Sequence, residues 1–286
     1  MQSVFVWLSR CPLWLLHSLG ALLGWLTFWL SPSYRRRFKE NSRLAGVEHA
    51  ARPAVAHAGR LLMELPFLWL REAGQPIRPR LTWEGADLIA DAHAQGRGVL
   101  LLTPHMGSFE VAAQAYAERF SDTFGAITVL YRPARKAWVR RLMDNSRARP
   151  GVSTAPATLA GVRQMLRALR RGETVGLLPD QVPPEGMGVW APFFGKPAYT
   201  MTLAARLVQQ TGAIPLLIWG ERLARGAGYR VHVCALNETL PTDVNAQAES
   251  AAVINRAMEQ MILQRPEQYL WGYNRYKTPR SARPDG

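Results

Sequence analysis

The stretch GVLLLTPHMGSFEVAAQAYAERF, residues 98–120, decides the fold class of this chain. Residues 98–103 form a short apolar run, which is typical of a buried β-strand. Pro104 and Gly107 then mark a tight turn, and a helical pattern begins at Phe109. From residue 80 onward, similar apolar runs alternate with amphipathic segments, which indicates an α/β fold.

The turn carries one histidine and one carboxylate, His105 and Glu110. On one continuous helix they would lie about 140° apart, but the turn places His105 at the end of a strand and Glu110 in the first turn of a helix. Ser108 is the expected N-cap of that helix. Open α/β sheets bind ligands at the carboxyl ends of their strands, so we expect Glu110 to orient His105 as a general base. Taken alone, a histidine at a strand end also suits a structural role.

The same pattern predicts the remaining elements of the α/β region. We expect strands near residues 81–84, 98–103, 126–131, 174–178, 214–219 and 229–235. We expect helices near 86–95, 109–119, 136–147, 157–171, 200–211 and 245–264. The sequence contains no GxSxG motif and no GxxxxGK phosphate loop, so the nucleophile should be a hydroxyl or amine of the substrate.

The N-terminal region has the composition of a membrane segment. Residues 11–30, CPLWLLHSLGALLGWLTFWL, contain no charged side chain and match the length of a transmembrane helix. The basic residues Arg35–Arg37 and Lys39 follow this segment, whereas Arg10 alone precedes it, so the positive-inside rule places the rest of the chain in the cytoplasm. A helix lying in the membrane interface, or a buried helix of a soluble protein, would fit the same residues.

Net charge and cysteine content limit the kinds of partner and cofactor that we expect. The formal net charge of +14 suits anionic membrane lipids, an acidic protein or nucleic acid. No nucleic-acid-binding module is recognisable, and a membrane surface explains the charge more simply, so we expect no nucleic-acid partner. The two cysteines, Cys11 and Cys234, are too few for a disulfide framework or a CxxC metal site.

Several motifs resemble one family. HMGSFE, residues 105–110, fits the HxxxxD/E motif of the glycerolipid-type acyltransferases. The other segments resemble, in order and spacing, the late acyltransferases of lipid A biosynthesis: LYRP (130–133), LPDQ (178–181), PFFG (192–195), GAIPLL (212–217) and RPEQYLWGYNRYK (265–277). The six-residue motif alone is unspecific, whereas the ordered set covers nearly the whole chain.

The resemblance implies an acyltransferase that moves a fatty acyl chain from acyl carrier protein to a hydroxyl of a lipid A precursor or related glycolipid acceptor. It implies a central, mixed but mostly parallel sheet flanked by helices, together with an N-terminal membrane helix. It also implies that the protein lies at the inner membrane, with the catalytic domain on the cytoplasmic face. The corresponding segments are an anchor (1–31), a membrane-proximal helical layer (32–79), an α/β acyltransferase domain (80–280) and a polar tail (281–286). No metal or cofactor is expected.

The resemblance also implies roles for individual residues. His105 would deprotonate the acceptor hydroxyl, and Glu110 would orient His105. Arg132 would grip an acceptor phosphate, while Asp180 and Gln181 would orient either the acceptor sugar or the surroundings of His105. Gly107 and Ser108 complete the predicted substrate-binding set. The acceptor preference stays open, because the family often has Asp where this chain has Glu110 and a larger polar residue near Ser108. A different glycolipid or a lysophospholipid is the alternative acceptor. A catalytically silent membrane scaffold is the non-enzyme alternative.

Overall fold

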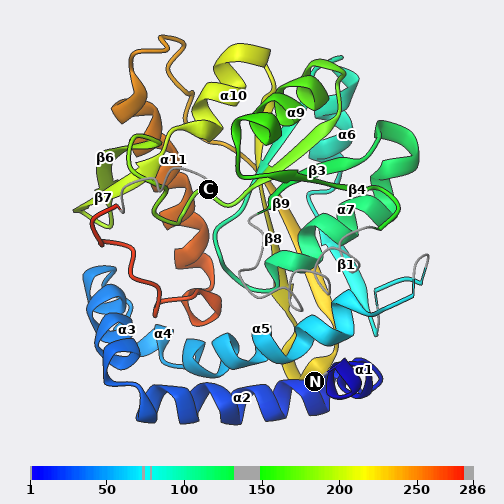
Figure 1. The fold of residues 1–286 in the computed structure, drawn as a ribbon, viewed down its shortest axis with the longest axis vertical. Coiled ribbons are helices and arrows are strands. Elements are labelled where there is room, and N and C mark those ends of the chain that lie inside the picture. The colour runs from blue at the N-terminus through cyan, green and yellow to red at the C-terminus, as the bar shows by residue number, and fades with distance from the viewer. Residues whose placement is uncertain (1, 73–74, 78, 132–148, 280–286) are drawn as a thin grey trace.

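The computed structural model describes residues 2–72, 75–77, 79–131 and 149–279. A seven-stranded sheet in the order β1-β9-β8-β2-β5-β3-β4 runs through the molecule (Figure 1). Its strands are β1 (Leu81–Glu84), β2 (Val99–Leu102), β3 (Ile127–Tyr131), β4 (Val152–Pro156), β5 (Thr174–Leu177), β8 (Ile214–Arg222) and β9 (Tyr229–Ala235). All neighbouring strands are parallel except β8 and β9, which confirms the predicted mixed, mostly parallel sheet.

Helices cover both faces of this sheet. They are α6 (Asp87–Ala94), α7 (Phe109–Phe124), α9 (Leu159–Arg170), α10 (Leu203–Thr211) and α11 (Gln247–Gln264). The side chains of β2 alternate between two cores: Val99 and Leu101 pack with α6 and α7, whereas Leu100 and Leu102 pack with α9, α10 and α11. Because both faces are buried, β2 is apolar at every position rather than alternating.

The six predicted strands are present, and the structure adds three that the sequence did not predict. These are β4 and an antiparallel hairpin of β6 (Gly188–Phe193) and β7 (Lys196–Met201). Strand β8 extends to Arg222, beyond the predicted end at residue 219. The predicted helix at 136–147 and the polar tail at 281–286 lie outside the described residues.

The N-terminal quarter of the chain forms a layer of helices against one end of the sheet. These are α1 (Gln2–Ser9), α2 (Leu13–Leu30), α3 (Pro32–Leu44), α4 (Glu48–Ala51) and α5 (Ala54–Trp69). In Figure 1, α2 and α5 run side by side across the bottom of the molecule, where the end of the β8–β9 hairpin reaches them. Among the described residues, α2 is the one helix long and apolar enough to cross a membrane.

Helix α2 packs closely along α5. A Cβ added at Gly20, Gly24 or Gly59 would overlap the backbone of the facing helix, so these glycines allow the two backbones to approach. The Nε2 atom of His17 lies 3.0 Å from Glu64 Oε2 of α5. The opposite face of α2 leaves apolar side chains exposed, including Trp14, Leu22, Leu26, Trp29 and Leu30.

Candidate active site

The turn between β2 and α7 is held by two distant segments of the chain. The Gly107 N–H donates to the Gln268 carbonyl at 2.9 Å, and the Leu270 N–H donates to the His105 carbonyl at 3.2 Å. The Ser108 N–H donates to the Gly220 carbonyl of β8 at 2.7 Å. The turn therefore has a fixed shape, set by the end of β8 and by residues of the 265–277 motif.

Gly107 has a conformation that only glycine adopts readily. Its φ is +55°, and a Cβ would overlap the carbonyl oxygen of Gly220. Its own carbonyl accepts a hydrogen bond from Arg222 Nη2 at 2.5 Å, and Ser108 is fully buried. Both residues build the turn, with their N–H groups bonded to carbonyls, and a direct contact of either with substrate stays a prediction.

The carboxylate that binds the His105 ring is Asp180. Its Oδ1 lies 2.6 Å from His105 Nδ1, and its Oδ2 accepts the His105 backbone N–H at 2.9 Å. The side chain of Asp180 is 2% exposed and that of His105 is 18% exposed. The sequence analysis expected Glu110 to orient His105, whereas the carboxylate bonded to the His105 ring in the structure is that of Asp180. This contact matches the interpretation in which Asp180 orients the surroundings of His105.

The strand register explains this pairing. Strands β2 and β5 are neighbours in the sheet, with Leu102 opposite Leu177. His105 lies three residues beyond Leu102, and Asp180 lies three residues beyond Leu177. The two side chains therefore leave the sheet side by side at the carboxyl ends of parallel strands, which is where open α/β sheets place their ligands.

The surroundings of Asp180 favour its charged form. Burial alone would raise the pKa of the Asp180 carboxyl, but the charge of His105, two hydrogen bonds from His105 and the charge of Arg275 hold it below its usual range. A charged Asp180 can only accept in this contact, so the proton lies on His105 Nδ1. Because no described residue is hydrogen-bonded to Nε2, the lone pair of that nitrogen is available to accept a proton.

Glu110 lies in the first turn of α7, as predicted, and is half-buried. Its Oε2 accepts a hydrogen bond from Trp69 Nε1 at 3.2 Å, which connects α7 to the last residue of α5. The Phe109 ring packs edge-on against His105, with 5.0 Å between the ring centroids. A catalytic part for Glu110 stays a prediction.

Arg275, in the 265–277 motif, is a site residue that the sequence analysis did not single out. Its guanidinium is buried, donates to the Tyr199 carbonyl and to Thr200 Oγ1 at 2.7 Å each, and lies over the ring of Phe193. Arg275 therefore fixes the β6–β7 hairpin beside Asp180. A basic residue placed among the aromatic residues of this motif was the available signal.

A buried ion pair supports the turn from below. Arg222 Nε and Nη2 each lie 2.9 Å from a carboxylate oxygen of Glu64, and Tyr229 and His17 also bond to this carboxylate. Burial would raise the pKa of Glu64, but the charge of Arg222 and the hydrogen bonds from His17 and Arg222 lower it to about 2. The signal in the sequence was one acidic residue within the apolar run LLMELPFLWL, residues 61–70.

Gln181 and Arg132 are the remaining residues of the predicted site. Gln181 follows Asp180 and is half-buried, and the next backbone N–H, of Val182, donates to Tyr273 Oη at 3.0 Å. Arg132 lies outside the described residues. Within the described part of the chain, no cluster of three or more His, Cys, Asp or Glu side chains could hold a metal ion.

Comparison with known proteins shows the family of the chain. The sequence profile of the family described as "Bacterial lipid A biosynthesis acyltransferase" matches residues 4–278. The lipid A biosynthesis lauroyltransferase of Escherichia coli (strain K12) is 30% identical over 233 residues, 80% of this chain and 70% of that protein.

Two other relatives carry names of the same kind. The lipid A biosynthesis palmitoleoyltransferase of Escherichia coli (strain K12) is 29% identical over 221 residues, 77% of this chain and 69% of that protein. A lipid A biosynthesis acyltransferase of Haemophilus influenzae is 24% identical over 196 residues, 68% of this chain and 58% of that protein. With a profile match over nearly its whole length and His105 set against a buried carboxylate, the chain belongs to the bacterial lipid A biosynthesis acyltransferases.

Proposed function

We propose that this protein transfers a fatty acyl group from acyl carrier protein to a hydroxyl of a lipid A precursor, with His105 as general base. The pairing of His105 Nδ1 with the buried Asp180 carboxylate carries the proposal, because it leaves Nε2 as the proton acceptor of a partly exposed side chain. Membership of the family supplies the acyl transfer and the lipid A-type acceptor. The acyl-carrier-protein donor and the roles of individual residues are part of the proposal.

The proposed reaction needs no nucleophile from the protein. Nε2 of His105 takes the proton of the acceptor hydroxyl as the oxygen attacks the thioester carbonyl. The charge of Asp180 stabilises the imidazolium that forms. When the tetrahedral intermediate collapses, the C–S bond breaks, and His105 returns the proton to the leaving thiolate.

The oxyanion of the intermediate would lie near the start of α7. The first N–H groups of a helix have no partner within the helix, and its dipole favours negative charge there. Phe109 contacts the His105 ring, which places this helix end beside the base. We infer that Glu110 keeps the start of α7 in place through Trp69, and that Arg132 binds a phosphate of the acceptor.

The proposed location is the cytoplasmic face of the inner membrane. The exposed apolar side chains of α1 and α2, with Leu62 of α5, form a surface suited to lipid, and the net charge of +14 favours anionic headgroups. Because α2 is packed along α5, we infer that α2 lies in the interface rather than crossing the bilayer.

The test is an assay of the purified protein in detergent with acyl-acyl carrier protein and a lipid A precursor, compared with lysophosphatidic acid, and with mass spectrometry of the product. We expect an acylated lipid A precursor and a loss of at least about a hundredfold in kcat for His105→Ala. Preference for lysophosphatidic acid would select the other acceptor class. No turnover of any acceptor would favour the silent scaffold, and near-normal turnover by His105→Ala would end the general-base proposal.

A further inference from the structure

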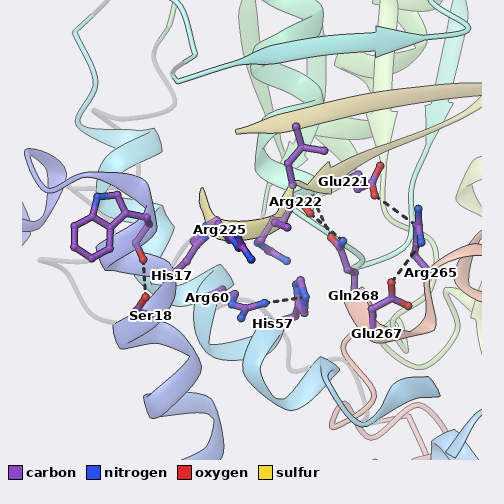
Figure 2. Close-up of a pocket in the computed structure, with 13 residues that line it drawn as sticks. His17, Ser18, His57, Arg60, Glu221, Arg222, Arg225, Arg265, Glu267 and Gln268 are labelled. Carbon is purple, nitrogen blue, oxygen red and sulfur yellow. Dashed lines mark hydrogen bonds and ion pairs between the residues drawn. The ribbon is translucent and has the colours of Figure 1, made fainter. Parts of the chain in front are cut away.

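A cavity lies between the helical layer and the end of the β8–β9 hairpin. It has a volume of about 710 Å³ and is lined by residues of α2, α5, the turn after β8 and the segment 265–268 (Figure 2). His105 does not line it. Arg222 and Gln268, which bond to the opposite side of the Gly107 turn, separate this cavity from the His105–Asp180 pair.

Four arginines line the cavity, and two of them have carboxylate partners. Arg222 is paired with Glu64. Arg265 lies 3.5 Å from Glu221 and 3.9 Å from Glu267. All the carboxylates that line the cavity, Glu221 and Glu267, therefore already have an arginine partner, and so does Glu64, which is buried beneath it.

The other two arginines, Arg60 and Arg225, have no carboxylate within ion-pair distance in the described part of the chain. Arg60 is half-buried in α5, and its Nε is buried without a hydrogen-bond partner. Arg225 has an exposed side chain in the short turn Ala224–Gly226, and its φ of +55° is unusual for a residue other than glycine. Figure 2 shows both guanidinium groups at the same cavity.

His57 adds another donor and no charge. Burial and the charges of Arg222 and Arg60 lower the pKa of His57 to about 2, so the ring is neutral. Its Nε2 accepts from Arg60 Nη1 at 2.9 Å, which leaves the proton on Nδ1, and Nδ1 is buried without a partner. The cavity is thus lined by two cations without a carboxylate partner, and their surroundings hold two buried N–H donors, Arg60 Nε and His57 Nδ1, without a hydrogen-bond partner. This arrangement is the complement of an anion.

We propose that this cavity binds the phosphate monoester of a lipid headgroup through Arg60 and Arg225. A planar guanidinium matches two oxygens of one phosphate group, and two guanidiniums at one cavity suit a doubly charged monoester better than a zwitterionic diester. The cavity opens beside Trp14, on the exposed apolar face of α2, so acyl chains attached to the phosphate can lie along that face. This site is separate from the base and does not rest on the proposed acyl transfer.

The test compares two matched double variants of the full-length protein in vesicle flotation. Arg60→Gln with Arg225→Asn removes both unpaired charges, and Asn tolerates the positive φ at position 225. Arg163→Gln with Arg170→Asn removes two exposed charges from α9, at the far end of the molecule from α2 in Figure 1. The vesicles are phosphatidylcholine alone or phosphatidylcholine with phosphatidate, and inorganic phosphate is titrated separately by calorimetry.

We expect the cavity variant to lose roughly tenfold in affinity for phosphatidate vesicles, and the α9 variant less than about twofold. Loss of inorganic phosphate binding as well would mean that the phosphate group suffices, whereas loss confined to phosphatidate would mean that the lipid is required. Equal losses in both variants, or none in the cavity variant, would overturn the proposal. If Arg60→Gln lowers the melting temperature, Arg225→Asn alone decides, because its side chain is exposed.

Discussion

Replacing Asp180 by asparagine tests how His105 is held. Both oxygens of the Asp180 carboxylate accept hydrogen bonds from His105, whereas an amide offers one accepting oxygen and one donating NH₂ group. The His105 backbone N–H needs an acceptor, so the oxygen of the introduced amide faces that group. The amide NH₂ is then directed at Nδ1, which must become an acceptor. The ring proton moves to Nε2, and the base loses the lone pair that would take the substrate proton.

The size of the effect follows from the role of the base. Loss of a general base costs about a hundredfold or more, and replacing a carboxylate that fixes a catalytic tautomer by an amide costs about ten thousandfold in another enzyme class. We therefore expect Asp180→Asn to lower kcat by about 10² to 10⁴, or about 2.7 to 5.4 kcal/mol in the activation free energy. The KM for the acceptor should change little, because Asp180 is 2% exposed and acts through His105.

The assay is the initial rate of acyl transfer at saturating donor over a range of acceptor concentrations. Glu185→Gln is the matched control: it removes an exposed carboxylate from the chain just after Asp180, and its kcat should equal that of the wild type. The melting temperature of each variant is measured alongside. A folded Asp180→Asn variant with near-normal kcat, or one whose defect lies in KM alone, would refute the tautomer argument.

The remaining predictions concern stability, the acceptor and topology. The pKa of His57 is lowered to about 2 in the folded protein, so below about pH 6.5 the unfolded chain takes up a proton that the folded one does not. As the pH falls below that value, the free energy of unfolding should fall by up to about 1.4 kcal/mol per pH unit. The variant His57→Gln should flatten this slope in denaturant titrations. Gly59→Ala should lower the free energy of unfolding by about 1–3 kcal/mol, since its Cβ meets the α2 backbone; an unchanged midpoint would contradict the packing. Arg132→Lys should reduce kcat/KM for a phosphorylated acceptor by about tenfold and leave a dephosphorylated analogue unaffected. A reporter fused after Gly286 should be cytoplasmic, and a periplasmic signal would contradict the proposed location.

Local signals were enough to predict the α/β class and most strands. The run at residues 98–103 and the helix from Phe109 were clear because apolar clustering, turn residues and helical periodicity agree there. The hairpin β6–β7 was missed because its two-residue turn is Phe194–Gly195, both with positive φ, rather than the Asn-Gly that marks such turns. Strand β4, VSTAP, has no apolar run to reveal it.

The partner of His105 could not be predicted from local sequence. Glu110 is near in the chain, whereas Asp180 is brought to the ring by the order of strands, which places β5 directly beside β2. Strand order depends on long-range packing, and neither the apolar runs nor the turns specify it. The role of the 265–277 motif could not be predicted from local sequence either, because its hydrogen bonds to the turn form only once the sheet and helices are assembled.

The hydrogen bonds that hold the His105 turn join residues made at different times during biosynthesis. Gln268 and Leu270, which bond to the turn through their backbones, and Arg275, which fixes the hairpin beside Asp180, are translated long after His105. A nascent chain, or one clipped ahead of Gln268, holds the histidine and the aspartate but lacks these constraints. We therefore expect competence for acyl transfer to arrive late in synthesis, well after the N-terminal helical layer has been made.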